Sequence, residues 1–215
     1  MTTVGIVGGT GPAGRGVAIR LASAGYDVTL GSRDAARASE IAGALVPRGG
    51  TVNGASNDEA ANADVVVIAT PWDSAVATVT ALREPLRGKV VISMVNALSR
   101  EGREVIPFYP PRGSMSAQLA FALPESTVVG AFHHLPAAQM EDLESGLDAD
   151  VVIVGDDASA RDLVAAMVNE MPGLRAVIAG SLSLASAVEA FTAVCISINI
   201  RHKSHSYLRL AGLER

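Results

Sequence analysis

The chain has 215 residues, 49% of them hydrophobic and 18% charged, a balance that excludes a disordered protein and suffices for the core of one domain, with or without an appendage. The formal net charge is −5 and no run of basic residues offsets it, so we expect no nucleic-acid partner. The single cysteine, Cys195, cannot form an internal disulfide, which favours a reducing compartment and predicts a cytoplasmic protein.

Strands and helices alternate through the first half of the chain. Thr3–Gly8 predicts a buried strand that begins too early to leave room for a signal peptide. The predicted helices are Arg15–Ala24, Asp34–Leu45 with Asp34 as its cap, Asp58–Asn62 and Asp73–Leu82. The other predicted strands are Asp27–Gly31, a weak Thr51–Gly54, Asp64–Ala69 and Val90–Ser93. Short connections between such elements predict parallel pairing, so the expected fold class is α/β, a Rossmann-type doubly wound and mainly parallel sheet.

The second half of the chain is less regular. It contains the predicted helices Ser116–Ala122 and Ala158–Glu170 and the predicted strands Thr127–Phe132, Asp150–Val154 and Arg175–Ile178. From Leu182 the chain is predicted to be helical almost to its end. Glu189 interrupts this apolar stretch, which favours a buried helix over a membrane span. We therefore divide the chain into a Rossmann domain over residues 1–180 and a C-terminal helical extension over residues 181–215.

A glycine-rich turn lies between the first predicted strand and the first predicted helix. It reads Gly9-Thr10-Gly11-Pro12-Ala13-Gly14. This GxGxxG pattern is weak evidence alone, but between a strand and a helix it predicts a dinucleotide site. Glycines let the backbone approach a pyrophosphate, and the helix N-terminus offers free N–H groups and a partial positive charge. The alternative is an ordinary glycine turn, which this context disfavours.

The end of the second predicted strand bears on the choice of nucleotide. NAD enzymes place an acidic residue there to bind the ribose 2′-hydroxyl. This chain has Ser32 and Arg33 instead, with Arg37 one helical turn later. A hydroxyl and two guanidinium groups suit a 2′-phosphate, which a carboxylate would repel. The pattern favours NADP over NAD, although two solvated arginines are the simpler alternative.

Thr70, Pro71 and Trp72 follow the predicted strand Asp64–Ala69. The carboxyl ends of parallel strands border the ligand crevice of an open sheet. We therefore expect Thr70 and Pro71 to line the ribose and nicotinamide. Trp72 fits core packing and a ligand contact equally well.

Four short sequence motifs, spread over the chain, are found together in one known family. They are Gly8-Gly9-Thr10-Gly11, Gly31-Ser32-Arg33, Pro71-Trp72 and His133-His134-Leu135-Pro136-Ala137-Ala138. Together they resemble NADPH-dependent F420 reductases, the F420:NADP oxidoreductases of archaea and actinobacteria. The resemblance spans essentially the whole chain, and its last string is the most specific. Two residues differ from the family pattern: Pro12 replaces an asparagine and Ser74 a histidine. These differences leave the prediction of NADP intact but concern the identity of the second substrate.

The resemblance implies reversible hydride transfer between NADP(H) and the 5-deazaflavin coenzyme F420. Catalysis would be positioning and exclusion of water, with no catalytic acid or base and no metal. The implied nucleotide contacts are Gly9, Thr10, Gly11, Pro12 and Ala13 for the pyrophosphate, Ser32, Arg33 and Arg37 for the 2′-phosphate, and Thr70 and Pro71 for the nicotinamide. The implied deazaflavin pocket comprises Met94, Val95, Asn96, His133, Pro136 and Ala137.

His133 and the last predicted helix each leave two interpretations open. On the residues alone, His133 reads as a histidine satisfied by backbone, whereas the resemblance favours a contact with the cofactor ring. Val188, Phe191, Val194 and Ile198 recur at helical spacing and could cover the sheet or pair with a second subunit. The resemblance favours the second arrangement, a homodimer.

Two other functions fit the nucleotide motifs. One is an NADPH-dependent imine or keto-acid reductase, a class that usually has a larger helical C-terminal domain and a catalytic Lys or Asp. The other is a redox sensor that binds NADP(H) without chemistry. Deazaflavin reduction by NADPH would discriminate among the three.

Overall fold

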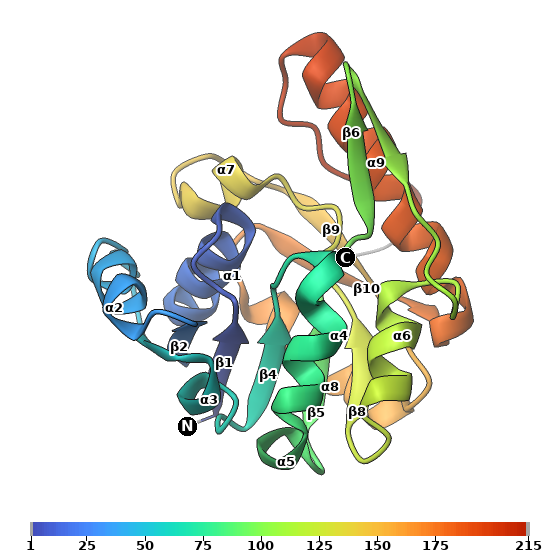
Figure 1. Ribbon diagram of the computed structural model, residues 1–215. Coiled ribbons are helices and arrows are strands. Elements are labelled where there is room, and N and C mark those ends of the chain that lie inside the picture. The colour runs from blue at the N-terminus through green and yellow to red at the C-terminus, as the bar shows by residue number, and fades with distance from the viewer. Residues whose placement is uncertain (1, 214–215) are drawn as a thin grey trace.

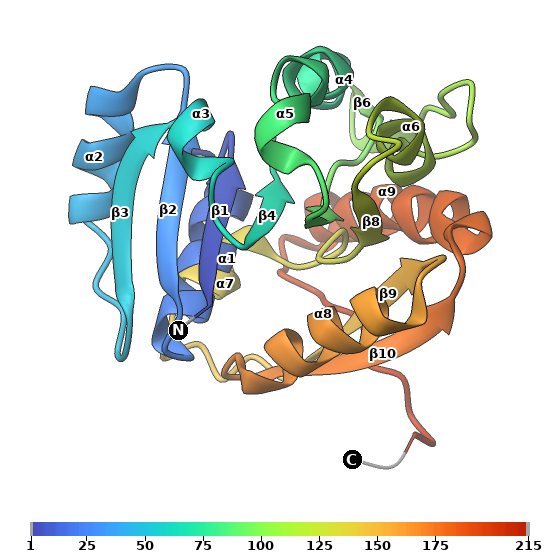
Figure 2. The same cartoon turned by 90° about the horizontal axis from the view of Figure 1, so that it is seen from below.

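The computed structural model describes residues 2–213 and contains an eight-stranded sheet with helices on both faces (Figures 1 and 2). Its strands are β1 (Thr3–Val7), β2 (Asp27–Ser32), β3 (Thr51–Ser56), β4 (Val65–Ile68), β5 (Val90–Ser93), β8 (Thr127–Gly130), β9 (Ala149–Gly155) and β10 (Leu174–Gly180). Their order across the sheet is β10-β9-β8-β5-β4-β1-β2-β3. All neighbours pair in parallel except β8 and β9, which are antiparallel. The predicted fold class is confirmed.

Two hydrophobic cores cover the two faces of this sheet. Because successive strand residues point to opposite faces, Ile6 belongs to one core and its neighbour Val7 to the other. The helices of the first face are α1 (Pro12–Ser23), α2 (Ala35–Gly43), α7 (Ala137–Glu141) and α8 (Ala158–Glu170). Those of the second face are α3 (Asn57–Ala60), α4 (Trp72–Ala81), α5 (Arg83–Leu86) and α6 (Met115–Ala122).

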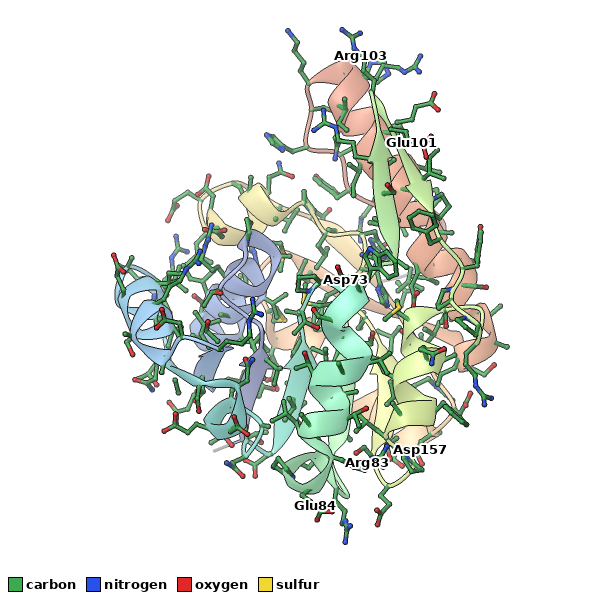
Figure 3. All side chains as sticks on the ribbon, in the orientation of Figure 1. Asp73, Arg83, Glu84, Glu101, Arg103 and Asp157 are labelled. Atoms are coloured by element: carbon green, nitrogen blue, oxygen red, sulfur yellow. The ribbon has the colours of Figure 1, made fainter. Side chains whose placement is uncertain are left out.

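A hairpin and the last helix form an arm that projects from the sheet (Figure 1). The hairpin consists of β6 (Leu98–Glu101) and β7 (Glu104–Pro107), and the helix is α9 (Ala185–His202), which a short 3₁₀ turn at Leu182–Leu184 precedes. The backbone N–H of Val105 donates to Ser197 Oγ on α9 at 2.9 Å. Glu101 and Arg103 lie at the far end of the hairpin (Figure 3). No pattern in the sequence predicted this hairpin.

Several predicted boundaries need correction. Helix α1 begins at Pro12, three residues earlier than expected, because a proline at the first helical position lacks an N–H that would be unpaired there anyway. Helix α9 ends at His202 instead of continuing almost to the end of the chain, since Lys203 adopts a left-handed conformation with φ 51°. Residues 204–213 are irregular. Helix α9 is also less buried than expected, with Phe191 41% and Val194 49% exposed.

A buried arginine fastens α7 to α1. Arg20 is only 2% exposed and its guanidinium donates to four backbone carbonyls instead of to a carboxylate. The acceptors are Met140 O at 3.0 Å, Pro172 O at 2.5 Å, Gln139 O at 2.6 Å and Asp142 O at 3.1 Å. Three of these carbonyls belong to α7 and the residue that follows it. Arg20 thereby fixes the position of the segment that begins at Pro136.

Candidate functional site: two adjoining cavities

A cleft of about 640 Å³ opens at the carboxyl ends of β1, β2, β4 and β5. Twelve of the sixteen predicted cofactor contacts line it, namely Thr10, Gly11, Pro12, Ala13, Ser32, Arg33, Arg37, Thr70, Pro71, Met94, Val95 and Asn96. Gly9 is buried beneath the turn and is not among the lining residues. The structure thus brings the first three sequence motifs together at one edge of the sheet, as parallel pairing requires.

The glycine turn leaves the start of α1 open toward this cleft. Gly11 is the N-cap of α1, and no side chain of the described residues caps this end. A Cβ at Gly11 would meet no atom of the described chain within 4 Å, so there is space above the backbone. Gly14 serves a different purpose, because a Cβ there would lie 2.5 Å from Gly9 O and would push the helix off the turn. An open helix N-terminus of this kind suits a pyrophosphate.

Ser32, Arg33 and Arg37 lie at the rim of the cleft, beyond β2. Asp34 separates them in sequence, but its carboxylate caps α2 by accepting from the backbone N–H of Arg37 at 3.1 Å. Arg33 and Arg37 are both exposed and both line the cleft. Two free guanidinium groups on one rim can bind a dianionic phosphate with paired hydrogen bonds.

Trp72 lies at the wall of the cleft and not in the core. Its side chain is 38% exposed, and its ring packs against that of Phe108 with 5.6 Å between centroids and a 41° tilt. Of the two interpretations that the sequence left open, the geometry therefore favours the ligand contact. Nearby, Thr70 Oγ1 is buried without a hydrogen-bond partner among the described residues.

A second cavity of about 680 Å³ adjoins the first. The two share Pro12, Ala13 and Asn96 as lining residues. The remaining predicted deazaflavin contacts, His133, Pro136 and Ala137, line only the second cavity. Its other walls come from residues that sequence reasoning missed, which are Arg15, His134, Leu135, Ala138, Glu141, Thr192, Cys195, Ile196, Asn199, His205 and Ser206. The arrangement offers two ligand sites in contact, which is what transfer of a hydride between two bound rings requires.

Asn96 lines both cavities and fixes the position of His133 through two hydrogen bonds. The Asn96 side-chain amide donates to His133 O at 2.9 Å, so its oxygen faces His133 Nδ1, at 3.1 Å. Nδ1 must then carry the proton, which leaves Nε2 as an acceptor. Nε2 lies against Gly130, where a Cβ would come within 3.1 Å of it. The preceding residue, Phe132, has a φ of 65°, a strained conformation typical of functional sites.

The buried His133 and its neighbour His134 are held neutral. Burial lowers the pKa of His133 to about 3, with a further contribution from His134. Burial likewise lowers the pKa of His134 to about 4. Neither imidazole can supply a proton at neutral pH, so the geometry of this cavity favours positioning over acid catalysis.

This neutrality predicts an acid-sensitive fold. The folded-state pKa of each histidine lies below the value near 6.5 of an unfolded chain, so unfolding takes up protons between those values. The stabilisation is complete above pH 6.5 and is lost as the pH falls toward 4. Thermal unfolding followed by circular dichroism should show Tm falling over this interval, and less steeply in His133→Gln than in the parent. Equal slopes would contradict the assignment, and His202→Gln, at the exposed end of α9, is the control.

Two contacts place α9 over the second cavity. Glu189, only 5% exposed, accepts from the backbone N–H groups of Met115 at 2.7 Å and Ser116 at 2.9 Å, at the start of α6. Burial raises the pKa of Glu189, while these hydrogen bonds lower it. Thr192, one turn later, donates to His133 O at 3.1 Å. Glu189 therefore anchors the arm to α6. The sequence signal for this role was a single carboxylate within an otherwise apolar helix.

Several known proteins are similar to this chain over nearly its whole length. Residues 3–97 match the family model described as NADP oxidoreductase coenzyme F420-dependent. The F420-dependent NADP reductase of Methanocaldococcus jannaschii is 34% identical over 98% of this chain and 99% of its own, and that of Methanothermobacter thermautotrophicus is 32% identical over 98% and 93%. An Arthrobacter crystal structure, provisionally named an F420-dependent NADP reductase, superposes with a TM-score of 0.81 at 26% identity and covers 96% of this chain and 97% of its own.

Proposed function

Since the chain belongs to the F420-dependent NADP reductase family, we propose that it catalyses reversible hydride transfer between NADP(H) and the 5-deazaflavin coenzyme F420. The observation that carries the proposal is the pair of cavities that share Pro12, Ala13 and Asn96. A dinucleotide in the first would present its nicotinamide at the boundary, where a ring in the second can meet it face to face. The protein supplies position and a dry environment, and the two rings supply the redox chemistry.

Each predicted contact has a role in this proposal. Thr10, Gly11, Pro12 and Ala13 hold the pyrophosphate over the start of α1, with Gly9 buried beneath to shape the turn. Ser32, Arg33 and Arg37 bind the 2′-phosphate. Thr70 and Pro71 support the nicotinamide, and Trp72 joins them. Asn96 borders both rings, whereas Met94 and Val95, expected at the deazaflavin, line the nucleotide cleft on the nicotinamide side. His133, Pro136 and Ala137 form the wall behind the deazaflavin.

The decisive test is spectroscopic. Protein, NADPH and oxidised F420 are mixed, and the absorbance of the deazaflavin is followed as it bleaches on reduction. We expect bleaching that depends on the protein and matches NADPH consumed one to one. NADPH binding without bleaching would indicate a sensor, and NADPH oxidation by an imine or a keto acid instead would indicate a reductase of that other class.

We also propose that the protein is a homodimer built on the arm. Phe191, Val194 and Ile198 on α9, and Leu184 in the turn before it, are each between 41% and 49% exposed in the single chain. Such a continuous apolar face on a helix is typical of a subunit interface. We expect sedimentation to give twice the mass of the chain, and Val194→Glu to halve it. A monomeric parent at micromolar concentration would contradict the proposal.

The helical stretch that contains α9 also bears on where the protein resides in the cell. Of the described residues, one helical stretch, Leu182–His202, is long and apolar enough by composition to cross a membrane. Glu189 and Thr192, near its middle, instead bind α6 and the His133 carbonyl. These contacts support a soluble protein without a membrane partner. We also propose that the protein is cytoplasmic and binds small-molecule cofactors, and the net charge of −5 supports the absence of a nucleic-acid partner. The division at residue 180 into Rossmann domain and helical extension is part of the same proposal.

A further inference from the structure

The chain that follows α9 folds back over the edge of the sheet. We call Ser204–Leu213 the C-terminal strap. It contains no helix or strand, and it returns from the outer end of the arm toward β9 and β10 (Figure 1). Two of its residues, His205 and Ser206, line the second cavity. An irregular segment can form a stable wall only where other groups fix its backbone.

Asn199 fixes the near end of the strap. Lys203 turns the chain with its left-handed conformation, and Ser204 N then donates to Asn199 O at 3.1 Å. The Asn199 Oδ1 accepts from the backbone N–H of Ser206 at 2.7 Å and from the Ser206 hydroxyl at 2.7 Å. One amide oxygen on the last turn of α9 thus holds the residue that borders the cavity.

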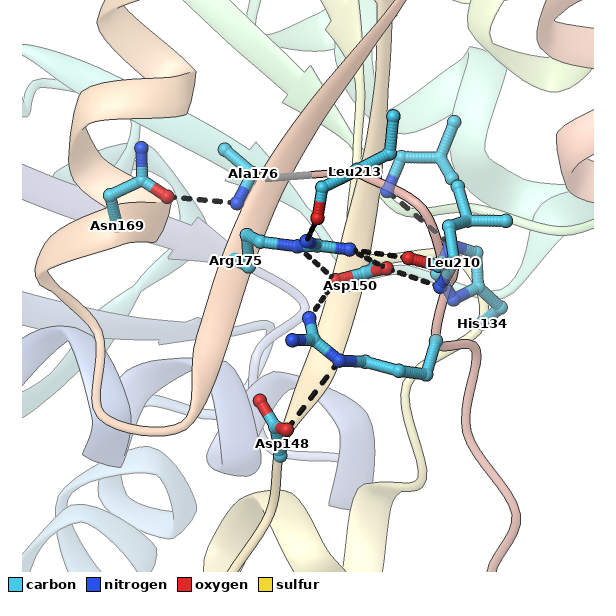
Figure 4. A network of polar contacts seen from close by, with 10 residues as sticks. His134, Asp148, Asp150, Asn169, Arg175, Ala176, Leu210 and Leu213 are labelled. Carbon is cyan, nitrogen blue, oxygen red and sulfur yellow. Dashed lines mark hydrogen bonds and ion pairs between the residues drawn. The ribbon is translucent and has the colours of Figure 1, made fainter. Parts of the chain in front are cut away.

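Asp150 fixes the far end. Its side chain is 0% exposed, and four donors converge on its two oxygens (Figure 4). Arg175 donates through Nε at 2.7 Å and Nη2 at 2.6 Å, Arg209 through Nη1 at 2.6 Å, and the backbone N–H of Leu210 at 2.6 Å. The Asp150 backbone N–H donates to Leu208 O at 2.9 Å. Three of these five contacts come from the strap itself.

Arg175 extends the same attachment along the strap. Its guanidinium also donates to Leu210 O at 2.9 Å and to Leu213 O at 3.0 Å. Burial alone would raise the pKa of Asp150, but the hydrogen bonds from Arg175, Leu210 and Arg209 outweigh it and hold the pKa at about 2. The carboxylate is therefore charged at any pH where the enzyme works. Without that charge, Arg175 would lose its paired carboxylate, and Arg209 would keep the ion pair with Asp148, 3.5 Å from its Nε.

We propose that Asp150 is a positioning residue for the deazaflavin, because it holds the C-terminal strap where His205 and Ser206 complete the wall of the second cavity. It lines neither cavity, and its hydrogen bonds reach the second cavity through the strap, while its charge also acts on His134 in the wall of that cavity. The nucleotide cleft shares no residue with the strap. Loss of the contacts between Asp150 and the strap should thus weaken deazaflavin binding and leave nucleotide binding intact. This inference rests on the proposed function.

The test compares Asp150→Asn with the parent in three measurements. An amide keeps the size of the side chain but accepts weakly and cannot balance two arginines. We expect the KM for F420 to rise at least tenfold, the Kd for NADPH, measured without F420, to stay within twofold, and hydrogen exchange of the Leu210 amide to accelerate at least tenfold. Asp64→Asn is the matched control, since Asp64 is an exposed carboxylate that accepts from Thr3. It should change none of the three.

Arg209→Met in the full chain keeps the test decisive should Asp150→Asn fail to fold, because it removes one of the strap's own contacts with Asp150. It should raise the KM for F420 in the same direction, with NADPH binding retained. Faster exchange of Leu210 with an unchanged KM for F420, or an unchanged exchange rate of Leu210, would overturn the proposal. A parent that binds NADPH but does not reduce F420 would instead contradict the proposed function, and that result is separate because it needs no variant.

Discussion

Arg33→Asp is expected to weaken NADPH binding by about 10- to 150-fold, since each hydrogen bond to a charged group contributes about 1.5–3 kcal/mol. Arg33 is exposed at the rim of the nucleotide cleft, and the Asp34 carboxylate beside it is engaged in capping α2. The new carboxylate removes a guanidinium and repels a 2′-phosphate, whereas it can accept from the 2′-hydroxyl of NADH. Binding is measured by the change in NADPH and NADH fluorescence on titration with protein. The preference for NADPH should shrink or reverse.

The control for this substitution is Arg103→Asp. It changes the net charge equally, but Arg103 lies at the far end of the β6–β7 hairpin (Figure 3). NADPH binding in this variant should match the parent, because solvent and salt screen charges separated by more than about 10 Å. If Arg33→Asp retains the nucleotide preference of the parent, the 2′-phosphate site has been placed wrongly.

Arg20→Met is expected to lower the free energy of unfolding by about 3–5 kcal/mol, because it removes the guanidinium that donates to four backbone carbonyls. In a chain of this size the loss corresponds to a fall in Tm of about 6–20 °C. Methionine fills a similar volume, so the effect reports lost hydrogen bonds more than a cavity. Denaturant unfolding followed by circular dichroism gives the free energy directly.

The same unfolding experiment on Arg48→Met supplies the comparison. Arg48 pairs with Glu144, but both side chains are more than half exposed. Such surface pairs contribute little, so the expected change is within about 0.5 kcal/mol. An Arg20→Met protein as stable as Arg48→Met would show that water can replace the guanidinium beneath α7.

The nucleotide half of the molecule was predictable because its signals are local. A glycine turn between a buried strand and a helix has one common use, and Ser32 with Arg33 follows the next strand at the expected offset. The cap at Asp34 was equally readable, and its carboxylate accepts from the backbone N–H of Arg37, three residues on. The structure confirms these elements to within a few residues.

The elements that sequence reasoning missed depend on distant partners. The β6–β7 hairpin carries charged residues at its tip and is supported by α9, which lies about ninety residues later. Helix α7 has only five residues and is fixed by Arg20 on α1. The C-terminal strap was predicted as helix because no residue near Ser204 indicates that this segment binds Asp150, more than fifty residues earlier in the chain. Six of the residues that line the second cavity belong to α9 and this strap, so the sequence indicated the string from His133 to Ala138 but not these distant parts of the wall.

The boundary shared by the two cavities has a thermodynamic consequence. Pro12, Ala13 and Asn96 belong to both, so an occupant of one cavity forms part of the surface that the other occupant meets. The affinities for NADP(H) and F420 are then linked, and the factor by which the first ligand changes the dissociation constant of the second must equal the reverse factor. The two ligands therefore bind cooperatively in the ternary complex. The order in which they bind affects the rate of assembly, but the free energy of forming the complex is the same for either order.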